Sequence, residues 1–456
     1  MKYFTIYRHL PVFIQNILCS WYGCRLQRQR YGGNYRAMYN DLEQSDKFSE
    51  KDILHYKEQK ISFILKYAYE HIPFYKKKFD EFGIHPKDFK ELNDLRKFPI
   101  LTKEEVREHW QEMLSDDRGK DDLIPYHTSG STGKPLHFYW TKQSLRHYWA
   151  TVWRGRNRFG IRKGDLHLNF TGKLVVPLEQ KKPPFWRYNR NLNQYMLNQQ
   201  HLTEDKVSHI VSFINNQKFV FFVGYPSIIY TLALLVEKNN LKVTTAPKYI
   251  FTSAEKVYST QRELIERIFK GSKIIEHYGF SEEAGAASQC ECGCYHEDFE
   301  MGHLEIKETG MTKGTLLATG FQNLAMPFIR YEIGDTAIFS TDKCRCGRNS
   351  SVIRDIEGRV EDYIMTPEGG RITRLDYILK ESNNIIECQI VQREVGSIIL
   401  RIVRKDSYSI EDEQKILKII SQQFSPKLKV VFDYVARIER TKAGKFKYVV
   451  SELSKK

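Results

Sequence analysis

The chain has 456 residues, and its 71 lysines and arginines outnumber 56 aspartates and glutamates, which leaves a formal net charge of +15. Single hydrophobic cores stop growing at roughly 250–300 residues, so this length predicts two or three domains. The positive charge fits nucleic acid, anionic lipid or anionic small molecules as partners. The sequence contains no zinc-finger spacing, RNA-binding aromatic signature or basic heptad helix, so we do not expect a nucleic-acid-binding protein.

Residues 1–45 form a basic, aromatic-rich segment. No acidic residue precedes Asp41, whereas basic side chains recur from Lys2 to Arg36. Polar residues interrupt the early apolar ones, so no run approaches the roughly 20 residues that cross a bilayer, and no signal-peptide cleavage pattern is evident. We expect a cytoplasmic protein whose first helix either packs on its own domain or makes peripheral contact with an anionic membrane surface.

A loop rich in glycine, serine and threonine is the most distinctive feature of the chain. It joins two strand-like stretches, 123–126 and 136–140, and consists of His127, Thr128, Ser129, Gly130, Ser131, Thr132, Gly133, Lys134 and Pro135. Glycines let backbone N–H groups form an anion-binding nest, and Lys134 adds positive charge, so the loop suits a triphosphate. The spacing is not that of a Walker A loop, and a polar hairpin turn is the alternative.

Helices and strands alternate around and beyond this loop. Helical patterns occupy 50–82, as one helix or two, and 141–159. The elements that follow are strands at 219–223, 248–252 and 273–276 and helices at 228–237 and 259–269. This alternation predicts an α/β fold with mainly parallel sheets and flanking helices, whose ligands bind beyond the carboxyl ends of the strands.

The pattern changes after Gly358. Short β runs at 385–392, 397–403 and 429–432 and an amphipathic helix at 410–424 predict an α+β unit of small-domain size. We therefore expect a large, multi-part N-terminal domain over residues 1–357 and a small C-terminal domain over residues 358–456.

Five short motifs occur in a fixed order along the chain. After the glycine loop come His277-Tyr278-Gly279-Phe280-Ser281-Glu282, Arg330-Tyr331-Glu332-Ile333-Gly334-Asp335, Glu357-Gly358-Arg359-Val360-Glu361-Asp362 and Arg440-Thr441-Lys442-Ala443-Gly444-Lys445-Phe446-Lys447. Together they resemble the motifs of adenylate-forming (acyl-AMP) enzymes. The closest resemblance is to the phenylacetate–coenzyme A ligase-like branch, including members linked to capsular polysaccharide synthesis, and it spans roughly residues 60–450.

The resemblance implies ATP-dependent activation of a carboxylic acid as an acyl-adenylate. Transfer to coenzyme A or another acceptor would follow, with a small C-terminal domain that moves between the two steps. Residues 128–134 would hold the β- and γ-phosphates of ATP, and Lys134 and Lys445 would act in catalysis. Lys445 would reach the carboxylate and the α-phosphate, although it also lies in a basic run of the kind that is usually solvated.

The resemblance also assigns the other residues around the nucleotide. Glu282 would act in catalysis by binding Mg²⁺, a hard cation that prefers carboxylate oxygen, although Glu282 and Glu283 could instead begin a solvated helix. Ser281 would contact the α-phosphate, and Asp335 would accept from the ribose hydroxyls. The remaining nucleotide-site residues would be Ser253, Ala254, Glu255, His277, Tyr278, Gly279 and Arg359.

Five of the eight cysteines fall in two clusters. Cys290, Cys292 and Cys294 lie close to His296 in sequence, and Cys344 and Cys346 form a second group; thiolate with imidazole favours zinc. Related ligases carry a Cys and a His in the first place and Cys-x-Cys-Gly in the second. We expect a structural Zn²⁺ held by Cys290, His296, Cys344 and Cys346, with Cys292 or Cys294 as a substitute ligand; reduced thiols without metal are the alternative.

The sequence indicates neither the acid nor the acceptor. Residues 170–193 hold several aromatic and basic side chains, and they either line the carboxylate site or form a surface loop. Coenzyme A, a carrier-protein thiol, a sugar and an amine all remain open as acceptors. A catalytically inactive nucleotide-binding or scaffold protein of the same fold, within a polysaccharide assembly system, is the alternative function, and a homodimer is an expectation.

Overall fold

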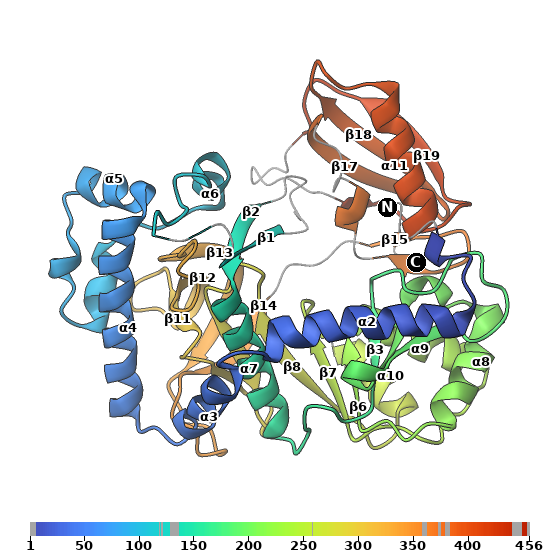
Figure 1. Ribbon diagram of the computed structural model, residues 1–456, viewed down its shortest axis with the longest axis horizontal. Helices are drawn as coiled ribbons and strands as arrows, with labels where there is room; N and C mark the ends of the chain where they lie inside the picture. Colours follow the sequence, from blue (N-terminus) through green and yellow to red (C-terminus); the bar gives the residue numbers. More distant parts are fainter. Residues whose placement is uncertain are drawn as a thin grey trace.

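The computed structural model describes residues 6–117, 119, 122–127, 136–257, 259–357, 363–372, 375–378, 384–439 and 449–453. Figure 1 shows a large part built around one long sheet and a smaller C-terminal unit, drawn in orange and red, on one side of it. Helices and strands are mixed throughout, which confirms the predicted α/β class.

Four helices open the chain: α2 (Val12–Tyr31), α3 (Tyr35–Ser45), α4 (Glu50–His71) and α5 (Pro73–Glu81). Ser49 caps α4 through a capping box with Asp52, which satisfies backbone N–H groups that the first turn leaves unpaired. Proline has no N–H and disfavours helical backbone before it, so α4 stops at Ile72 and Pro73 starts α5. The helical pattern at 50–82 is therefore two helices.

The first helix packs on its own domain. Arg187, fully buried on an edge strand, donates from Nε to the Gln15 side chain of α2 at 2.5 Å. Asn191 donates to the Ser20 carbonyl oxygen of the same helix at 2.6 Å. Arg187 belongs to the 170–193 stretch, so part of that stretch anchors α2. No helix among the described residues is both long and apolar enough to cross a bilayer.

The large sheet has twelve strands in the order β11-β12-β13-β14-β10-β9-β8-β7-β6-β3-β5-β4. The strands are β3 (His167–Thr171), β4 (Trp186–Asn189), β5 (Gln194–Asn198), β6 (Phe221–Gly224), β7 (Tyr249–Ser253), β8 (Lys273–Gly279), β9 (Ala286–Gln289), β10 (Tyr295–Glu297), β11 (Gly302–Ile306), β12 (Lys313–Gly320), β13 (Tyr331–Ser340) and β14 (Val352–Glu357). Strands β5, β3, β6, β7 and β8 run parallel, as the alternation predicts. The other strands pair antiparallel, so the parallel arrangement is confined to one half of the sheet.

Helices cover both faces of the parallel half. Successive residues of a strand point to opposite faces of the sheet, so neighbouring residues pack against different helices. Phe221 packs with α7 (Lys142–Asn157) in one core cluster. Phe222 packs on the other face with α8 (Glu204–Asn215), α9 (Pro226–Lys238) and α10 (Ser259–Ile268). The continuous apolar strands of this half are buried on both sides, as parallel strands generally are.

A separate hairpin leads into α7. Strands β1 (Leu123–His127) and β2 (His137–Thr141) pair antiparallel, so the glycine loop joins their ends. Residues 128–135 lie outside the described part of the chain. Thr141 at the end of β2 caps α7 through a capping box with Ser144.

The C-terminal unit has its own core. Strands β17 (Ile385–Glu394), β18 (Ser397–Arg404), β19 (Lys429–Tyr434) and β20 (Val449–Ser451) form a four-stranded sheet, and α11 is Ile410–Gln423. The short strands β15 (Ile364–Met365) and β16 (Arg371–Ile372) pair beside it. The core cluster there, from Ile364 to Val449, contains no residue from the large part. The β runs and the helix of this unit lie where the sequence predicts them.

Candidate functional site

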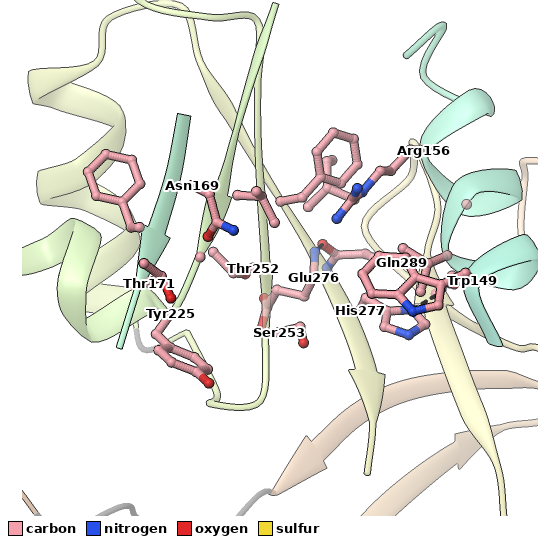
Figure 2. Close-up of a pocket in the computed structure, with 18 of the residues that line it drawn as sticks. Trp149, Arg156, Asn169, Thr171, Tyr225, Thr252, Ser253, Glu276, His277 and Gln289 are labelled. Carbon is pink, nitrogen blue, oxygen red and sulfur yellow. Dashed lines mark hydrogen bonds between the residues drawn. The ribbon is translucent and has the colours of Figure 1, made fainter. Parts of the chain in front are cut away.

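A cavity of about 250 Å³ lies where the parallel strands end. Its walls come from α7 on one side and from β3, β6, β7, β8 and β9 on the other (Figure 2). Ser253 at the end of β7 and His277 near the end of β8 both line it. The carboxyl ends of the strands therefore form a ligand-sized hollow, as the sequence predicts for this kind of sheet.

Gly224 sets the spacing of two strands at the edge of this cavity. A Cβ at residue 224 would lie 2.5 Å from the carbonyl oxygen of Phe170 and 2.6 Å from the Phe170 Cβ. Such contacts are too short for real side chains, so β6 approaches β3 this closely only with glycine.

The His277 ring is neutral, with the proton on Nδ1 and an accepting lone pair on Nε2. The Ser288 hydroxyl donates to Asp298 Oδ2 at 2.7 Å, so it accepts from His277 Nδ1, which lies 3.1 Å away. The proton is then on Nδ1, and Nε2, which has no partner among the described residues, carries a lone pair. Burial lowers the pKa of His277, which keeps the ring uncharged.

Two expected nucleotide-site carboxylates each accept a hydrogen bond from a tyrosine. The Tyr331 hydroxyl donates to Glu282 Oε1 at 2.8 Å, and the Tyr278 hydroxyl donates to Asp335 Oδ2 at 2.8 Å. Both bonds join β13 to β8 and the turn after it. Glu282 is only 4% exposed, so Glu282 does not begin a solvated helix. The structure therefore places Tyr278 against Asp335 and Tyr331 against Glu282.

The turn after β8 is also fixed from the hairpin side. Trp140 of β2 donates from Nε1 to the Ser281 carbonyl oxygen at 2.9 Å. This bond ties the hairpin whose strands the glycine loop connects to the turn that carries Ser281 and Glu282.

The residues at the end of β7 have different roles: one lines the cavity and another stabilises a neighbouring helix. Ser253 lines the cavity. Ala254 has a φ of 71°, which is unusual for a non-glycine residue and turns the chain away from the strand. Glu255 accepts from the Ser227 backbone N–H at 3.0 Å and from its hydroxyl at 2.9 Å. Glu255 therefore stabilises the start of α9 and is not part of the cavity lining.

The four predicted zinc ligands lie together. One ligand atom from each of Cys290, His296, Cys344 and Cys346 lies within 4.8 Å of the others. Cys290 Sγ is 3.7 Å from Cys344 Sγ, and Cys346 Sγ is 3.2 Å from His296 Nε2. Three sulfurs and one imidazole nitrogen form the donor set of a tetrahedral structural zinc site. Sulfurs this far apart are not a disulfide.

Some predicted site residues fall outside the described part of the chain. These are Thr128, Ser129, Gly130, Ser131, Thr132, Gly133, Lys134, Arg359 and Lys445. Gly279 is the last residue of β8 and connects Tyr278 to the turn before Ser281.

The sequence does not single out several residues that the structure places at the site. Tyr331 lies inside a quoted motif, but only the fold shows that its hydroxyl reaches Glu282. Arg156 lines the cavity from α7, where an arginine in a polar helix would be taken for a solvated one. Ser288 and Asp298 act through His277 from β9 and the chain after β10. Since these contacts join distant segments, no local pattern predicts them.

Solved structures share this fold. 2-Hydroxyisobutyryl-CoA ligase in complex with 2-HIB-AMP and CoA aligns with a TM-score of 0.57 at 20% identity, covering 88% of this chain and 90% of that chain. The same ligase in the postadenylation state, with R3-HIB-AMP, gives a TM-score of 0.53 at 20% identity, covering 88% of this chain and 89% of that chain. The chain therefore has the fold of the adenylate-forming ligases.

Sequence relatives extend along nearly the whole chain. Residues 364–452 match the CapK C-terminal domain. The chain is 26% identical over 456 residues to Protein CapK of Staphylococcus aureus, covering 98% of this chain and 99% of that protein. It is 25% identical over 423 residues to phenylacetate-coenzyme A ligase of Thermus thermophilus, covering 85% of this chain and 89% of that protein. The chain is thus a homologue of CapK and of the phenylacetate–coenzyme A ligases, as its motifs predict.

Proposed function

We propose that this protein activates a carboxylic acid with ATP as an acyl-adenylate and then transfers the acyl group to coenzyme A or another acceptor. The observation that carries the proposal is the pairing of Glu282 with Tyr331 and of Asp335 with Tyr278 beside the cavity. The homologous phenylacetate-coenzyme A ligases and the shared fold of a ligase bound to 2-HIB-AMP and CoA support it.

In the first step a carboxylate oxygen of the acid bonds to the α-phosphorus of ATP. The bond between that phosphorus and the bridging oxygen breaks, and pyrophosphate leaves with the electron pair. Placed cations and donors stabilise the charge that develops. Glu282 would hold Mg²⁺, which would supply positive charge to the phosphates, Ser281 would contact the α-phosphate, and Asp335 would accept from the ribose. Tyr278 stacks near adenine, in a pocket that Ser253, Ala254, Glu255, His277, Gly279 and Arg359 help to shape.

In the second step a thiolate or another nucleophile of the acceptor attacks the acyl carbonyl carbon, and AMP leaves. The C-terminal domain, residues 358–456, moves between the steps and carries Lys445 to the α-phosphate for the first one. The glycine loop, with Lys134, holds the β- and γ-phosphates. These assignments follow the motif resemblance, because residues 128–135 and 440–448 lie outside the described ranges.

Product analysis tests this proposal. Purified protein is incubated with ATP, Mg²⁺, hydroxylamine and a panel of aryl, fatty, hydroxy and dicarboxylic acids. Adenylation gives AMP, pyrophosphate and an acyl hydroxamate that depends on the acid. Formation of ADP and phosphate instead, or ATP binding without turnover of any acid, would contradict the proposal, and the second result would support the inactive nucleotide-binding alternative. Replacing hydroxylamine with coenzyme A then tests the acceptor.

We also propose that Cys290, His296, Cys344 and Cys346 hold a structural Zn²⁺. All four ligand atoms are already close in space, and Cys292, on the same loop, is exposed and outside the group. The ion would join the β9–β10 turn to the loop between β13 and β14, close to the strand that carries Asp335.

We propose finally that α2 contacts an anionic membrane surface. Phe13, Ile17 and Trp21 follow one another at four-residue spacing on one face of the helix and are 65%, 60% and 71% exposed. Arg25 and Arg28 on the same helix are exposed as well, and no acidic residue precedes Asp41. Apolar insertion combined with positive charge fits anionic lipid.

Vesicle sedimentation tests this surface. Wild-type protein should pellet with phosphatidylserine-containing vesicles, and Trp21→Ser with Ile17→Ser should lose that binding. Phe82→Ser removes an aromatic residue that is 64% exposed elsewhere and is the matched control. Equal pelleting of wild type and the Trp21 variant would contradict the proposal. If light scattering showed instead that the variant turns a dimer into a monomer, the surface would be a homodimer interface.

A further inference from the structure

One wall of the cavity carries an arginine that no carboxylate of the described residues neutralises. Figure 2 shows the side chain of Arg156 extending from α7 into the cavity. Its Cζ lies 4.8, 5.4 and 5.7 Å from the ring centroids of Trp153, Phe221 and Phe251. Within the described ranges, no carboxylate and no hydrogen-bond acceptor contacts this guanidinium. Aromatic rings therefore hold the cation in place without satisfying its N–H groups.

The preceding arginine on the same helix shows the contrast. Arg154 is fully buried, whereas Arg156 is half-buried, and Arg154 contacts Asp298 at 2.9 Å, Glu300 at 2.7 Å and Asp46 at 3.1 Å. Those carboxylates raise the pKa of Arg154 despite its burial. The helix thus buries one arginine with three acidic partners and leaves Arg156 without one.

The acidic residue that lines the cavity does not supply the missing partner. Glu276 accepts from Arg262 Nη2 at 2.6 Å and from the Val257 backbone N–H at 3.2 Å. Its charge is therefore matched on the far side of β8. Arg156 is half-buried, and desolvating a cation that has no acidic protein partner is costly, so its retention at a cavity wall points to a ligand anion.

The electrostatic surroundings of Arg156 are positive. Burial lowers the pKa of Arg156 to about 10, so the guanidinium is still charged at neutral pH. Arg30 of α2 stacks on Trp149, another lining residue, with its Cζ 4.0 Å from the ring centroid. Arg30 further lowers the pKa of Arg156, and an anion between them would stabilise both charges.

The rest of the lining combines aromatic and aliphatic side chains with polar groups, and the polar groups disfavour a purely hydrocarbon acyl group. Thr252 Oγ1 and His277 Nε2 are buried and have no partner among the described residues. Asn169 and Thr171 add an amide and a hydroxyl to the same lining. An aliphatic or phenyl group would leave these groups and Arg156 unmatched, which opposes binding.

We propose that Arg156 binds a second anionic group on the acid that this site activates. The substrate is then a small acid with a carboxylate, phosphate or sulfate at the end remote from the reacting carboxylate. The guanidinium forms two parallel hydrogen bonds to the oxygens of that group, and the surrounding rings fix its plane. This inference rests on the proposed function, because it takes the cavity as the pocket for the acyl group.

The test compares matched acids on matched variants. Dicarboxylic acids, and ω-phosphate or ω-sulfate acids, are each paired with the monocarboxylic acid of the same length in the hydroxamate assay. Wild-type kcat/KM should favour the dianionic member on the order of 100-fold or more. Arg156→Met should remove most of that preference, mainly through KM, and leave the monocarboxylic acid nearly unchanged. Arg156→Lys, which keeps the charge, should recover part of it.

Lys142→Gln is the control, since it removes one positive charge from an exposed position on the same helix. Calorimetric binding of the preferred diacid, measured without turnover, separates the inferred anion site from the proposed adenylation activity. Equal turnover of diacids and monoacids, unchanged in Arg156→Met, would overturn this inference and leave adenylation standing. No turnover of any acid, with diacid binding that Arg156→Met abolishes, would overturn the proposed function and support the anion site. The relative rates of carboxylate, phosphate and sulfate acids identify the second group.

Discussion

At the scale of single residues, two tyrosines position the carboxylates on which the proposed chemistry depends. A buried carboxylate is useful to a metal only when its oxygens point in a fixed direction, and the hydroxyl of Tyr331 fixes one oxygen of Glu282. The second oxygen is then available to a cation. The hydroxyl of Tyr278 likewise fixes one oxygen of Asp335, the residue that we propose accepts from the ribose.

Tyr331→Phe removes the hydroxyl and keeps the ring, so its effect reports on orientation. We expect about a tenfold loss of adenylation and a higher Mg²⁺ requirement, since one hydrogen bond to a charged group contributes roughly 1.5 kcal/mol or more. Glu282→Gln should raise the Mg²⁺ requirement further. The measurement is a Mg²⁺ titration of acid-dependent AMP formation.

Tyr75→Phe is the matched control for that experiment. It removes a buried tyrosine hydroxyl that donates to the Pro327 carbonyl at 2.9 Å, away from the cavity lining. It should lower Tm without altering the Mg²⁺ titration. If Tyr331→Phe behaved like Tyr75→Phe, Tyr331 would have a purely structural role.

The motifs predicted Glu282, Asp335 and Tyr278 because each lies in a short, recognisable sequence. They did not predict Arg156 or Arg154, because the partners of Arg154 come from α3 and from residues more than 140 positions away, Asp298 and Glu300. Single-residue electrostatics of this kind depend on the fold. The local sequence around a single arginine on a helix does not indicate whether its side chain is solvated, paired with a carboxylate or placed to bind a ligand.

At the scale of elements, the cysteine cluster lies where two loops meet beside the paired strands β10 and β14. Cys290 and His296 flank the β9–β10 turn, and Cys344 and Cys346 lie between β13 and β14. The cysteine clusters suggested zinc, but the choice of Cys290, His296, Cys344 and Cys346 came from the resemblance to related ligases, with Cys292 or Cys294 left open as a substitute.

Zinc removal should therefore loosen this end of the sheet. Purified wild-type protein should contain about one zinc per chain by elemental analysis, in line with the usual four-ligand structural site. Cys344→Ser with Cys346→Ser should lose the metal and several degrees of Tm, whereas Cys292→Ser should keep both. Protein purified without chelators that contains no zinc, yet keeps its Tm, would contradict the assignment.

Three segments of the chain each contain a buried, neutral histidine, and these histidines make the free energy of unfolding depend on pH. Burial lowers the pKa of His147 on α7 and of His167 on β3 to about 3, and that of His201 to about 4. The unfolded value is about 6.5. Below that pH the unfolded chain binds more protons than the folded one, so this stability is present above pH 6.5 and lost as the pH falls.

Urea unfolding at a series of pH values measures the effect. The free energy of unfolding should fall by up to about 1.4 kcal/mol per pH unit per histidine between about pH 6.5 and 4. His167→Gln should give a shallower slope, and the exposed His209→Gln should not. A slope that His167→Gln leaves unchanged would assign the acid sensitivity to other groups.

At the scale of the whole molecule, the sequence predicted the parallel half of the sheet and the C-terminal unit. Apolar runs such as 221–223 lie between helices on both faces of the sheet and are easy to recognise. Most of the antiparallel half was not predicted: some of its strands, such as β10 with its three residues, hold no usable period, although β12 and β13 have eight and ten residues. Their pairing depends on contacts between segments far apart in the chain.

The two units have separate cores, which fits a C-terminal domain that moves. One hydrogen bond between them runs from Gln200 Nε2 to the Gln423 carbonyl oxygen at 2.5 Å. Lys445→Ala should strongly reduce adenylation and leave ATP binding nearly intact if, as we propose, this lysine acts in the adenylation step. Lys442→Ala, in the same basic run, is the control. Equal loss of binding and turnover in Lys445→Ala would show a structural role.

The most direct test of the central claim is acid-dependent exchange of labelled pyrophosphate into ATP. Exchange requires that a carboxylate displace pyrophosphate reversibly from the α-phosphorus, and it needs no acceptor. We expect exchange with wild-type protein in the presence of a suitable acid and Mg²⁺, and its near-complete loss in Lys445→Ala. Absence of exchange across a broad panel of acids, with ATP binding demonstrated separately, would contradict the account.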